Sequence, residues 1–211
     1  MKERGIIFNG EMVRAILDGR KTQTRRVMNN QPCTLSGETI SVQQDDFNFR
    51  WAGDLHNDTS GWFPCPLGKV GDRLWVRETF KTGVCTESTI AYKATHKPSD
   101  LEEGWYEEIK WTPSIHMPRR YSRITLEITD VRVERLNDIS NDDAKAEGIL
   151  MMGDNFGNGP AYCDYTLADL HDTAEWFNRA SDSFISLWQS IYGAESWLSN
   201  PWVWVIEFKR I

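Results

Sequence analysis

The sequence predicts an α+β fold: a small mixed β-barrel with helices packed against its outside. Two observations predict it. Segments that have strand character outnumber the helical ones, and most of them are joined by loops. In addition, the last strand, Trp202 to Phe208, is apolar on both faces, which is typical of a strand in the middle of a sheet or barrel. The 211 residues are 40% hydrophobic and 12% aromatic, enough to bury the core of a single domain with insertions.

The N-terminal part predicts one strand and one short helix. The strand starts at Ile6–Phe8, and the helix runs from about Glu11 to Asp18. Gly19 is the natural residue to end that helix. Residues Asn29 to Lys69 are rich in Gly, Asn, Asp, Ser and Pro, so we interpret them as an insertion with one short hairpin. The apolar residues of the helix fall at helical spacing: Met12, Val13, Ile16 and Leu17.

The middle of the chain predicts further strands. Arg73 to Phe80 forms a clear strand after a Gly-Asp turn, and Thr89–Lys93 and Trp105–Trp111 are two shorter ones. The last two lie within a second insertion, at about 84–119. We expect the longest strand region at Tyr121–Leu136, where the alternation of apolar residues changes near Asp130 and predicts a bend or bulge.

The C-terminal third predicts two helices before the final strand. Ser140 resembles the first residue of a capping box and opens a short helix through Glu147. A longer helix runs from about Asp172 to Tyr192 and ends at Gly193. We interpret one stripe of this helix as core: Phe177, Phe184, Ile185, Trp188 and Ile191.

Composition and charge exclude several classes of protein. The net charge is −7, which argues against a protein that coats long DNA but leaves room for a small basic pocket. No apolar run reaches the length of a membrane span and no signal region is visible, so we expect a soluble, cytoplasmic protein. The cysteines and histidines lack the spacing of a zinc site, and we expect no metal, no cofactor and reduced, buried thiols. The oligomeric state stays open. The cysteines are Cys33, Cys65, Cys85 and Cys163.

The segment Gly19–Arg26 carries four basic residues within eight positions. Such a cluster can hold an anion or a nucleic-acid backbone. Neighbouring positive charges also disfavour the protonated form of Lys21 and lower its pKa. A lysine that is uncharged at neutral pH can act as a base, and a threonine hydroxyl within its reach can act as a nucleophile. The alternative interpretation is an ordinary solvated basic turn.

Three separated blocks of the sequence resemble the ASCH domain, a family with a PUA-like β-barrel fold. They are Gly19–Arg26, Gly71–Val76 and Val205–Lys209, in the same order as in the family. The segment from His116 to Ile124 is similar to the version found in phage and prophage proteins. The resemblance therefore implies a PUA-like barrel with insertions.

The resemblance also implies an activity. The small bacterial members of the family hydrolyse N4-acetylcytidine with a lysine as proton acceptor, a threonine three residues later as nucleophile, and a glutamate on a downstream helix as proton donor. Lys21 and Thr24 match the first two positions, and the glutamate falls on Glu147. Asp142 and Asp143, one turn away, are alternative carboxylates.

Further residues would support this chemistry. Arg20 and Arg26 would stabilise the oxyanion or hold a phosphate. If the protein only binds a nucleotide, an aromatic residue such as Trp75 or Trp105 would stack on a base. Arg77 and Glu78 point to opposite faces of their strand, and we expect Arg77 to face the pocket or a buried ion-pair partner.

The geometry of a strand sets a condition on the mechanism. In a plain strand Lys21 and Thr24 point to opposite faces, so they cooperate only if the segment turns between them.

Charged residues outside this segment have simpler interpretations. The basic residues Arg119, Arg120 and Arg123 are expected at a solvated rim, and Glu207 needs a basic partner if it is buried.

Two other functions use the same pocket. In one, the chain is a PUA-like module that binds RNA or a modified nucleotide without converting it. In the other, it is an RNA-cleaving member of the family. The expected partner is thus a small nucleoside or RNA, and the enzyme hypothesis is an amidohydrolase of an acylated cytosine nucleoside.

Overall fold

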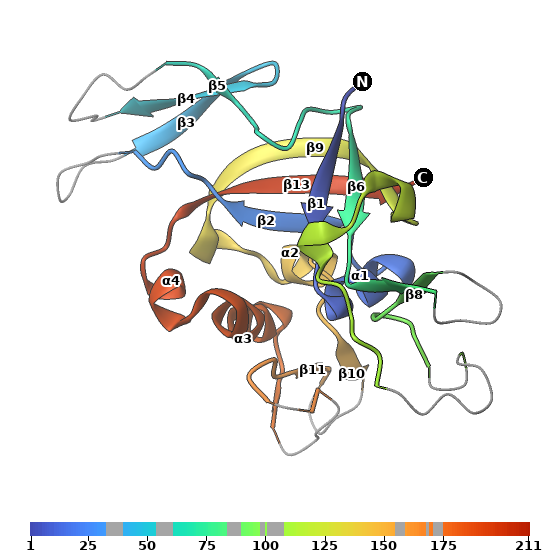
Figure 1. Ribbon diagram of the computed structural model, residues 1–211. Coiled ribbons are helices and arrows are strands. Elements are labelled where there is room, and N and C mark those ends of the chain that lie inside the picture. The colour runs from blue at the N-terminus through green and yellow to red at the C-terminus, as the bar shows by residue number, and fades with distance from the viewer. Residues whose placement is uncertain are drawn as a thin grey trace.

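A five-stranded sheet forms the centre of the protein in the computed structural model (Figure 1). The structure describes residues 1–32, 40–53, 61–83, 90–97, 100, 108–154, 159–167, 169–170 and 175–211. The first two strands of the sheet are parallel, and every other pair is antiparallel. In spatial order the strands are β1 (Glu3–Ile7), β6 (Arg73–Arg77), β9 (Thr125–Arg135), β13 (Trp202–Arg210) and β2 (Gln23–Val27).

Strand β13 lies inside this sheet, as its apolar sequence predicts. It pairs with β9 on one side and β2 on the other, and Trp202 to Ile206 are all buried. The bulge predicted near Asp130 is also confirmed. The register shifts where Glu207 and Phe208 face Asp130 and Ile128, so β9 has one extra residue at this point.

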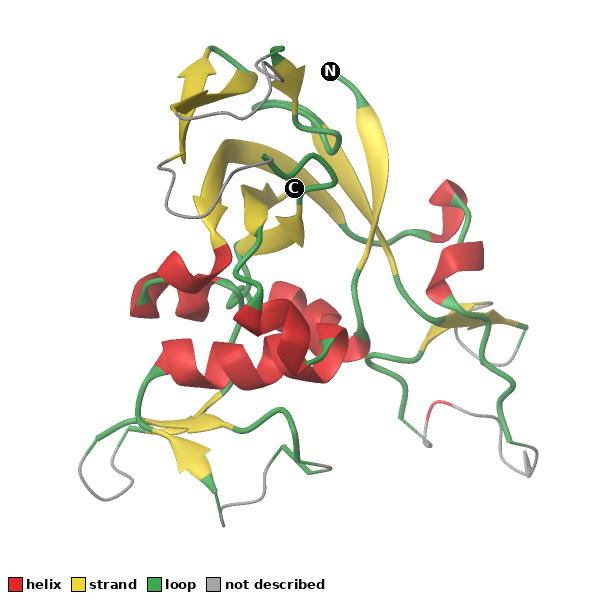
Figure 2. Cartoon of the chain, turned by 90° about the vertical axis from the view of Figure 1, so that its left-hand side faces the viewer, coloured by secondary structure: helices red, strands yellow, loops and turns green. Residues whose placement is uncertain are grey.

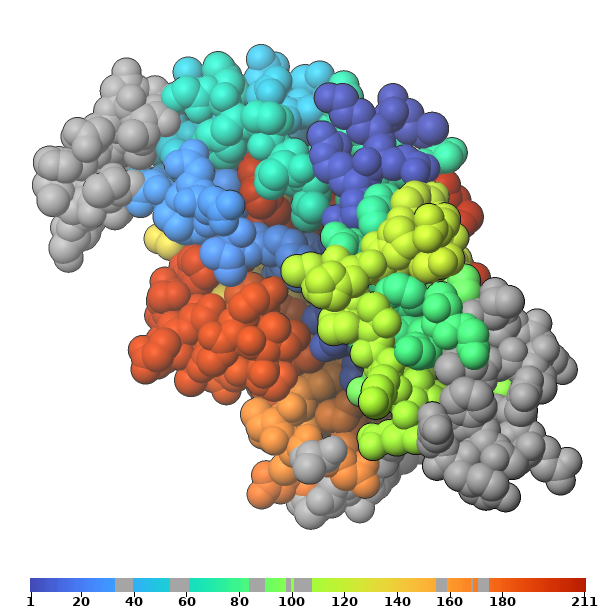
Figure 3. Space-filling view, viewed as in Figure 1, coloured from blue at the N-terminus to red at the C-terminus, as the bar shows by residue number. Residues whose placement is uncertain are grey.

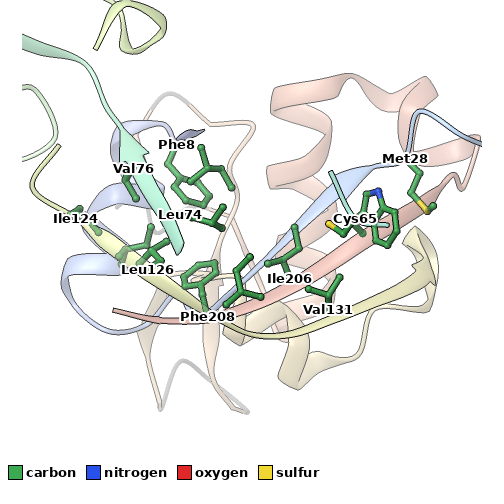
Figure 4. Packing of buried hydrophobic residues seen from close by; sticks show 14 of the residues in the cluster. Phe8, Met28, Cys65, Leu74, Val76, Ile124, Leu126, Val131, Ile206 and Phe208 are labelled. Atoms are coloured by element: carbon green, nitrogen blue, oxygen red, sulfur yellow. The ribbon is translucent and has the colours of Figure 1, made fainter. Parts of the chain in front are cut away.

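The two faces of the sheet bury two hydrophobic clusters. The first contains Leu126, Val131, Ile206 and Phe208, and their packing is shown in Figure 4. The second, which includes Val203 and Val205, packs against helices. Figure 2 shows these helices below the sheet, with the short strands β10–β12 below them in turn. The helices are α1 (Gly10–Leu17), α2 (Asn141–Ala146), α3 (Ala180–Tyr192) and α4 (Ala194–Leu198).

The insertion expected at 29–69 contains a three-stranded sheet where one hairpin was predicted. Its strand β4 contributes to the first cluster: Phe49 lies 5.0 Å from Trp204 and Trp51 lies 5.2 Å from Trp202, between ring centroids. Residues 33–39 and 54–60 lie outside the described part. The strands are β3 (Ile40–Asp45), β4 (Asn48–Gly53) and β5 (Phe63–Pro64).

The middle of the chain departs from its predicted strands. The strand expected from Arg73 to Phe80 divides into β6 and β7 (Phe80–Thr82), and β7 pairs with β8 (Ile90–Tyr92). The strand expected at Trp105–Trp111 falls partly on 101–107, outside the described residues, and Trp111 itself is not in a strand. Three single turns of 3₁₀ helix complete this part of the fold: Ser114–His116, Arg119–Tyr121 and Leu136–Asp138.

The C-terminal helices follow the prediction in part. Ser140 caps α2, and Gly193 follows the end of α3, as expected. However, α3 begins at Ala180, not at Asp172, a residue outside the described part. Its stripe is also shifted: Phe184 and Trp188 are buried, while Ile191 is 41% exposed. The short strands before α3 are β10 (Met151–Gly153), β11 (Ala161–Cys163) and β12 (Trp176–Phe177).

These elements confirm the α+β class. Within the described residues no sheet closes into a barrel, since β1 and β2 form the two edges of the five-stranded sheet. No helix of the described part is long and apolar enough to cross a membrane. Cys65 and Cys163 are free and buried, whereas Cys33 and Cys85 lie outside the described residues.

Candidate active site

Lys21 occupies the short connection between α1 and β2. Gly19 follows the helix with φ +76°, a conformation that suits glycine and redirects the chain. The backbone N–H groups of Arg20 and Lys21 both donate to Ala15 O, at 2.9 and 3.0 Å. Lys21 then forms an isolated antiparallel bridge with Glu147, before β2 begins at Gln23. The basic turn is thus held against α1 on one side and against the end of α2 on the other.

Glu147 is placed by the end of α2. The Ser140 side chain accepts a hydrogen bond from Asp143 N at the start of the helix, and Glu147 is the C-cap. The backbone N–H of Thr22 donates to Ala146 O at 2.8 Å, which joins the two segments. Gly148 follows with φ +89°, and a Cβ there would lie 2.7 Å from Lys21 Cβ. Only a glycine lets α2 end this close to Lys21.

Lys21 and Glu147 form a buried ion pair. Lys21 Nζ donates to Glu147 Oε2 and to Glu147 O, each at 2.8 Å. The Lys21 side chain is 0% exposed and that of Glu147 is 3% exposed. Burial lowers the pKa of Lys21; Glu147 opposes this, and Arg26 and Arg25 lower the pKa further. The pKa of Lys21 is therefore lowered, as the sequence predicts, but burial contributes more to this shift than the neighbouring positive charges do.

Arg25 completes this cluster, and the sequence did not single it out. Its guanidinium is fully buried, with Nη1 3.3 Å from Glu147 Oε1 and Nη2 2.9 Å from Glu134 Oε2. Lys21 and Arg25 thus hold one oxygen each of the same carboxylate. The sequence does indicate that Arg25 lies on the same side as Lys21, because residues 21, 23 and 25 of an extended segment point to the same face.

Thr24 lies on the other face of β2. It pairs with Ile206 of the first cluster and is 2% exposed. No hydrogen bond between described residues joins it to Lys21. The turn that the mechanism requires is not seen between residues 21 and 24, all of which are described: Lys21 precedes the strand, and it shares a face with residues 23 and 25. Thr24 itself is inside the strand and faces the core.

Arg20 and Arg26 lie on either side of the ion pair. Arg20 Nη1 donates to Gly148 O at 2.7 Å, next to Glu147. Arg26 Nη2 donates to Ile7 O at 2.8 Å, which links the edge strands β2 and β1. The Phe8 ring lies between these groups, with its centroid 5.3 Å from Arg26 Cζ and 5.6 Å from Lys21 Nζ.

Trp75 and Arg77 are not brought to this cluster. Leu74 and Val76 of the same strand are in the first cluster, so Trp75 and Arg77 point to the opposite face of the sheet. There the Arg77 guanidinium stacks on Trp75, 5.4 Å from the ring centroid.

The expectation of a buried partner for Arg77 is wrong, because its neighbour Glu78 is the buried group. Glu78 is 2% exposed and binds Arg123 through both oxygens at 2.8 Å. Arg123, expected at a solvated rim, binds this buried carboxylate with a side chain that is 27% exposed. Glu207 pairs with Arg132, not with a residue of the Lys21 cluster.

The alternative carboxylates are engaged elsewhere. Asp142 pairs with Lys145 at the surface. Asp143 accepts from Arg132 Nη2 at 2.8 Å and lies 3.6 Å from Arg25 Nη2. Of the three candidates, Glu147 is the one that contacts Lys21.

A cavity of about 510 Å³ lies beside Phe8, which is part of its wall. Its wall includes the start of α1, the buried Glu78, and hydroxyl and ammonium groups. Figure 3 shows, on one face of the molecule, the orange-red surface of α3 and α4 adjoining the blue surface around β2. The polar residues of the cavity wall are Asn9, Glu11, Arg14, Glu78, Thr79, Lys93 and Ser114.

In the described part of the chain, no three His, Cys, Asp or Glu residues are grouped in a way that could hold a metal ion. Comparison with protein-family models, with curated proteins and with solved structures finds no match.

Proposed function

We propose that the chain is an ASCH-type amidohydrolase that removes the acyl group from an acylated cytosine nucleoside, with Lys21, Thr24 and Glu147 as its reactive residues. One observation carries the proposal. Two residues 126 positions apart in the chain form a fully buried Lys–Glu contact of 2.8 Å, and burial lowers the pKa of that lysine. A buried lysine with a lowered pKa and a carboxylate beside it are the groups that acid–base catalysis needs.

The reaction that we propose needs Thr24 to come within reach of Lys21, since no hydrogen bond between described residues joins their side chains. Lys21, in its neutral form, takes the proton of the Thr24 hydroxyl, and the threonine oxygen attacks the acyl carbonyl. The C–N bond breaks, and the proton passes from Lys21 Nζ through Glu147 Oε2 to the departing amine. Water then hydrolyses the acyl-threonine and releases the acid. Because Thr24 is 2% exposed, this reaction requires that the core face beside Ile206 opens to the substrate.

The cavity beside Phe8 suits a nucleoside. Its volume, about 510 Å³, falls in the usual range of small-molecule pockets, roughly 300–1,000 Å³. Phe8 belongs to its wall, and the Phe8 ring also lies near Lys21 and Arg26; the wall offers amide, hydroxyl and charged groups for hydrogen bonds to a base and a sugar. The contact from Arg26 to Ile7 O, which draws the open edges of the sheet together, supports a PUA-like arrangement.

The test is release of cytidine from N4-acetylcytidine by the purified protein. The three variants Lys21→Met, Thr24→Val and Glu147→Gln are each expected to lower turnover by at least about 100-fold. A Lys145→Met variant, which removes a surface lysine paired with Asp142, serves as the control and keeps full activity. Turnover that survives the change at Thr24 would exclude it as nucleophile.

A specific observation favours a second candidate function, a module that binds a nucleotide or RNA without converting it. Lys21, Thr24 and Glu147 are all at most 4% exposed, whereas the cavity beside Phe8 is open to a ligand. Binding of cytidine derivatives without turnover, weakened by Lys93→Ala in the cavity wall and unchanged by Thr24→Val, would support this function instead.

A further inference from the structure

Arg25 is the charged residue of the cluster for which the proposed reaction has no role. Its side chain is 0% exposed, and it is the second cation on Glu147. The strand places it on the face opposite Thr24, since Arg25 pairs with Val205 of the second cluster and Thr24 pairs with Ile206 of the first. It can therefore act on the reaction only through Glu147.

The geometry divides the Glu147 carboxylate between two cations. Oε2 accepts from Lys21 Nζ at 2.8 Å, and Oε1 lies 3.3 Å from Arg25 Nη1. A buried carboxylate with no cation is very costly, so a lone Lys21–Glu147 pair would resist any loss of the lysine proton. With Arg25 on the other oxygen, Glu147 keeps an ion-pair partner when Lys21 is neutral.

Arg25 is itself held in place from a third side. Its Nη2 lies 2.9 Å from Glu134 Oε2 of β9 and 3.6 Å from Asp143 Oδ2 of α2. The Phe184 ring of α3 covers the guanidinium, with its centroid 6.0 Å from Cζ. A guanidinium remains charged at any pH at which the protein folds, unlike an ammonium in the same place. The planar guanidinium of Arg25 thus supplies a permanent charge at a fixed position.

We propose that Arg25 is a positioning residue that neutralises and orients Glu147 and so allows Lys21 to exchange its proton. The role in catalysis rests on the proposed function, whereas the effect on the Lys21 proton does not. Other charged or titratable groups surround the pair without this double contact. They are Glu11 from α1, Arg20 from the connection after α1, Arg26 from β2, Asp143 from α2, Arg132 and Glu134 from β9, and Tyr165, which lines a small gap beside Glu147.

The first test follows the titration of Lys21 by NMR of its side-chain Cε–Hε group. In Arg25→Met the lysine becomes the sole cation on Glu147, and its midpoint is expected to rise by about one pH unit or more. Arg25→Lys places an ammonium there, which keeps a positive charge but lacks the planar guanidinium, and its midpoint is expected to lie between those of the wild type and Arg25→Met. The matched control is Arg132→Met, which disturbs Glu134 and Asp143 but makes no contact with Glu147. It leaves the Lys21 midpoint unchanged.

The second test uses turnover of N4-acetylcytidine as a function of pH. Arg25→Met is expected to move the rise of kcat to higher pH and to lower kcat at neutral pH roughly tenfold or more, with KM little changed. Arg25→Lys restores the pH profile in part. If the wild-type protein does not turn over this substrate, the proposed reaction fails, and the titration of Lys21 still decides the role of Arg25.

A loss of folding does not leave the proposal untested. In Arg25→Met, Glu134 loses its contact with the guanidinium. The double variant Arg25→Met with Glu134→Gln removes the charge of that carboxylate as well, and the same rise of the Lys21 midpoint is expected. A folded Arg25→Met protein in which Lys21 titrates as in the wild type would overturn the proposal and leave Arg25 a purely structural ion pair.

Discussion

Lys21 brings a titratable ammonium into the interior of the protein, so its charge is linked to the stability of the fold. Burial lowers its pKa from the ordinary value of 10.5 in the folded state. Between that lowered pKa and about 10.5, the unfolded chain binds more protons than the folded one, so the free energy of unfolding rises with pH across this window. Below the lowered pKa the cost of the buried charge is present in full.

We therefore expect the wild type to gain stability relative to Lys21→Met as the pH rises from the lowered pKa of Lys21 to about 10, by at most about 1.4 kcal/mol per pH unit. Urea unfolding of both proteins over this range measures the difference. The comparison between the two proteins removes the contributions of other groups, such as Cys163, whose pKa burial raises to about 11. Parallel stability curves for the two proteins would contradict the prediction.

Glu78 provides a second prediction for a single residue. Both of its oxygens bind Arg123, and Glu78 is 2% exposed, while the Arg123 side chain is 27% exposed. Glu78→Gln turns an amide N–H₂ toward the guanidinium and is expected to cost about 1–3 kcal/mol in urea unfolding. The exposed pair of Glu3 and Arg119 is the control, and Glu3→Gln is expected to cause no measurable change.

The sequence could predict Glu147 but not Arg25 or Glu78, for a physical reason. Lys21 was singled out by the basic segment, and Glu147 is what the family resemblance implies, on a helix that the capping box at Ser140 predicts locally. Which face of β2 becomes the inner one depends on pairing with β13, a partner almost 180 residues away. Local sequence does not reveal such long-range packing. The rule that adjacent strand residues point to opposite faces therefore could not tell that Glu78, and not Arg77, is buried.

At the level of elements, the close approach of α1, β2 and α2 depends on Gly148. This residue has φ +89°, and a Cβ there would lie 2.7 Å from Lys21 Cβ and 2.9 Å from Ala15 Cβ. An alanine would therefore meet both backbone strain and a clash that flexible side chains cannot relieve.

We expect Gly148→Ala to be clearly more destabilising than a glycine change that causes strain alone. Gly71 is the matched control, with φ +83° and no atom within 4 Å of an added Cβ. Gly71→Ala is expected to cost about 1–2 kcal/mol from strain. Gly148→Ala is expected to cost roughly 1–3 kcal/mol more from overpacking and to lower any activity that depends on Lys21. If urea unfolding shows the same loss of stability for Gly148→Ala and Gly71→Ala, the clash at Gly148 is contradicted.

The elements predicted best were those whose signals are local. The helix before Gly19, the capped α2 and the apolar β13 were correct, because caps and periodicity act within a few residues. The predicted helix from Asp172 started too early, since Trp176 and Phe177 pair with β11 in a small sheet. Local apolar spacing cannot reveal such tertiary pairing. The closed barrel remains a prediction, because closure depends on how the edges β1 and β2 meet.

For the whole molecule, the expectation of a single domain can be tested through its two clusters. Strand β13 supplies both, with Trp204 and Ile206 on one face and Val203 and Val205 on the other. The sheet β3–β5 joins the first cluster through Phe49 and Trp51, so the predicted insertion is part of the same packing. Because one strand carries both faces, neither cluster can lose its packing without exposing the other.

We therefore expect the protein to unfold in one cooperative transition. Trp51→Ala in the first cluster is expected to cost about 3–5 kcal/mol, and Leu187→Ala in the second about 2–5 kcal/mol. In each variant, urea unfolding followed by far-UV circular dichroism and by tryptophan fluorescence is expected to give coincident curves, both shifted from the wild type. A variant that shifts only one of the two probes would show that the clusters unfold separately. The sheet β3–β5, or the α2–α3 layer, would then be a unit of its own, and Lys21 would lie where the two units meet.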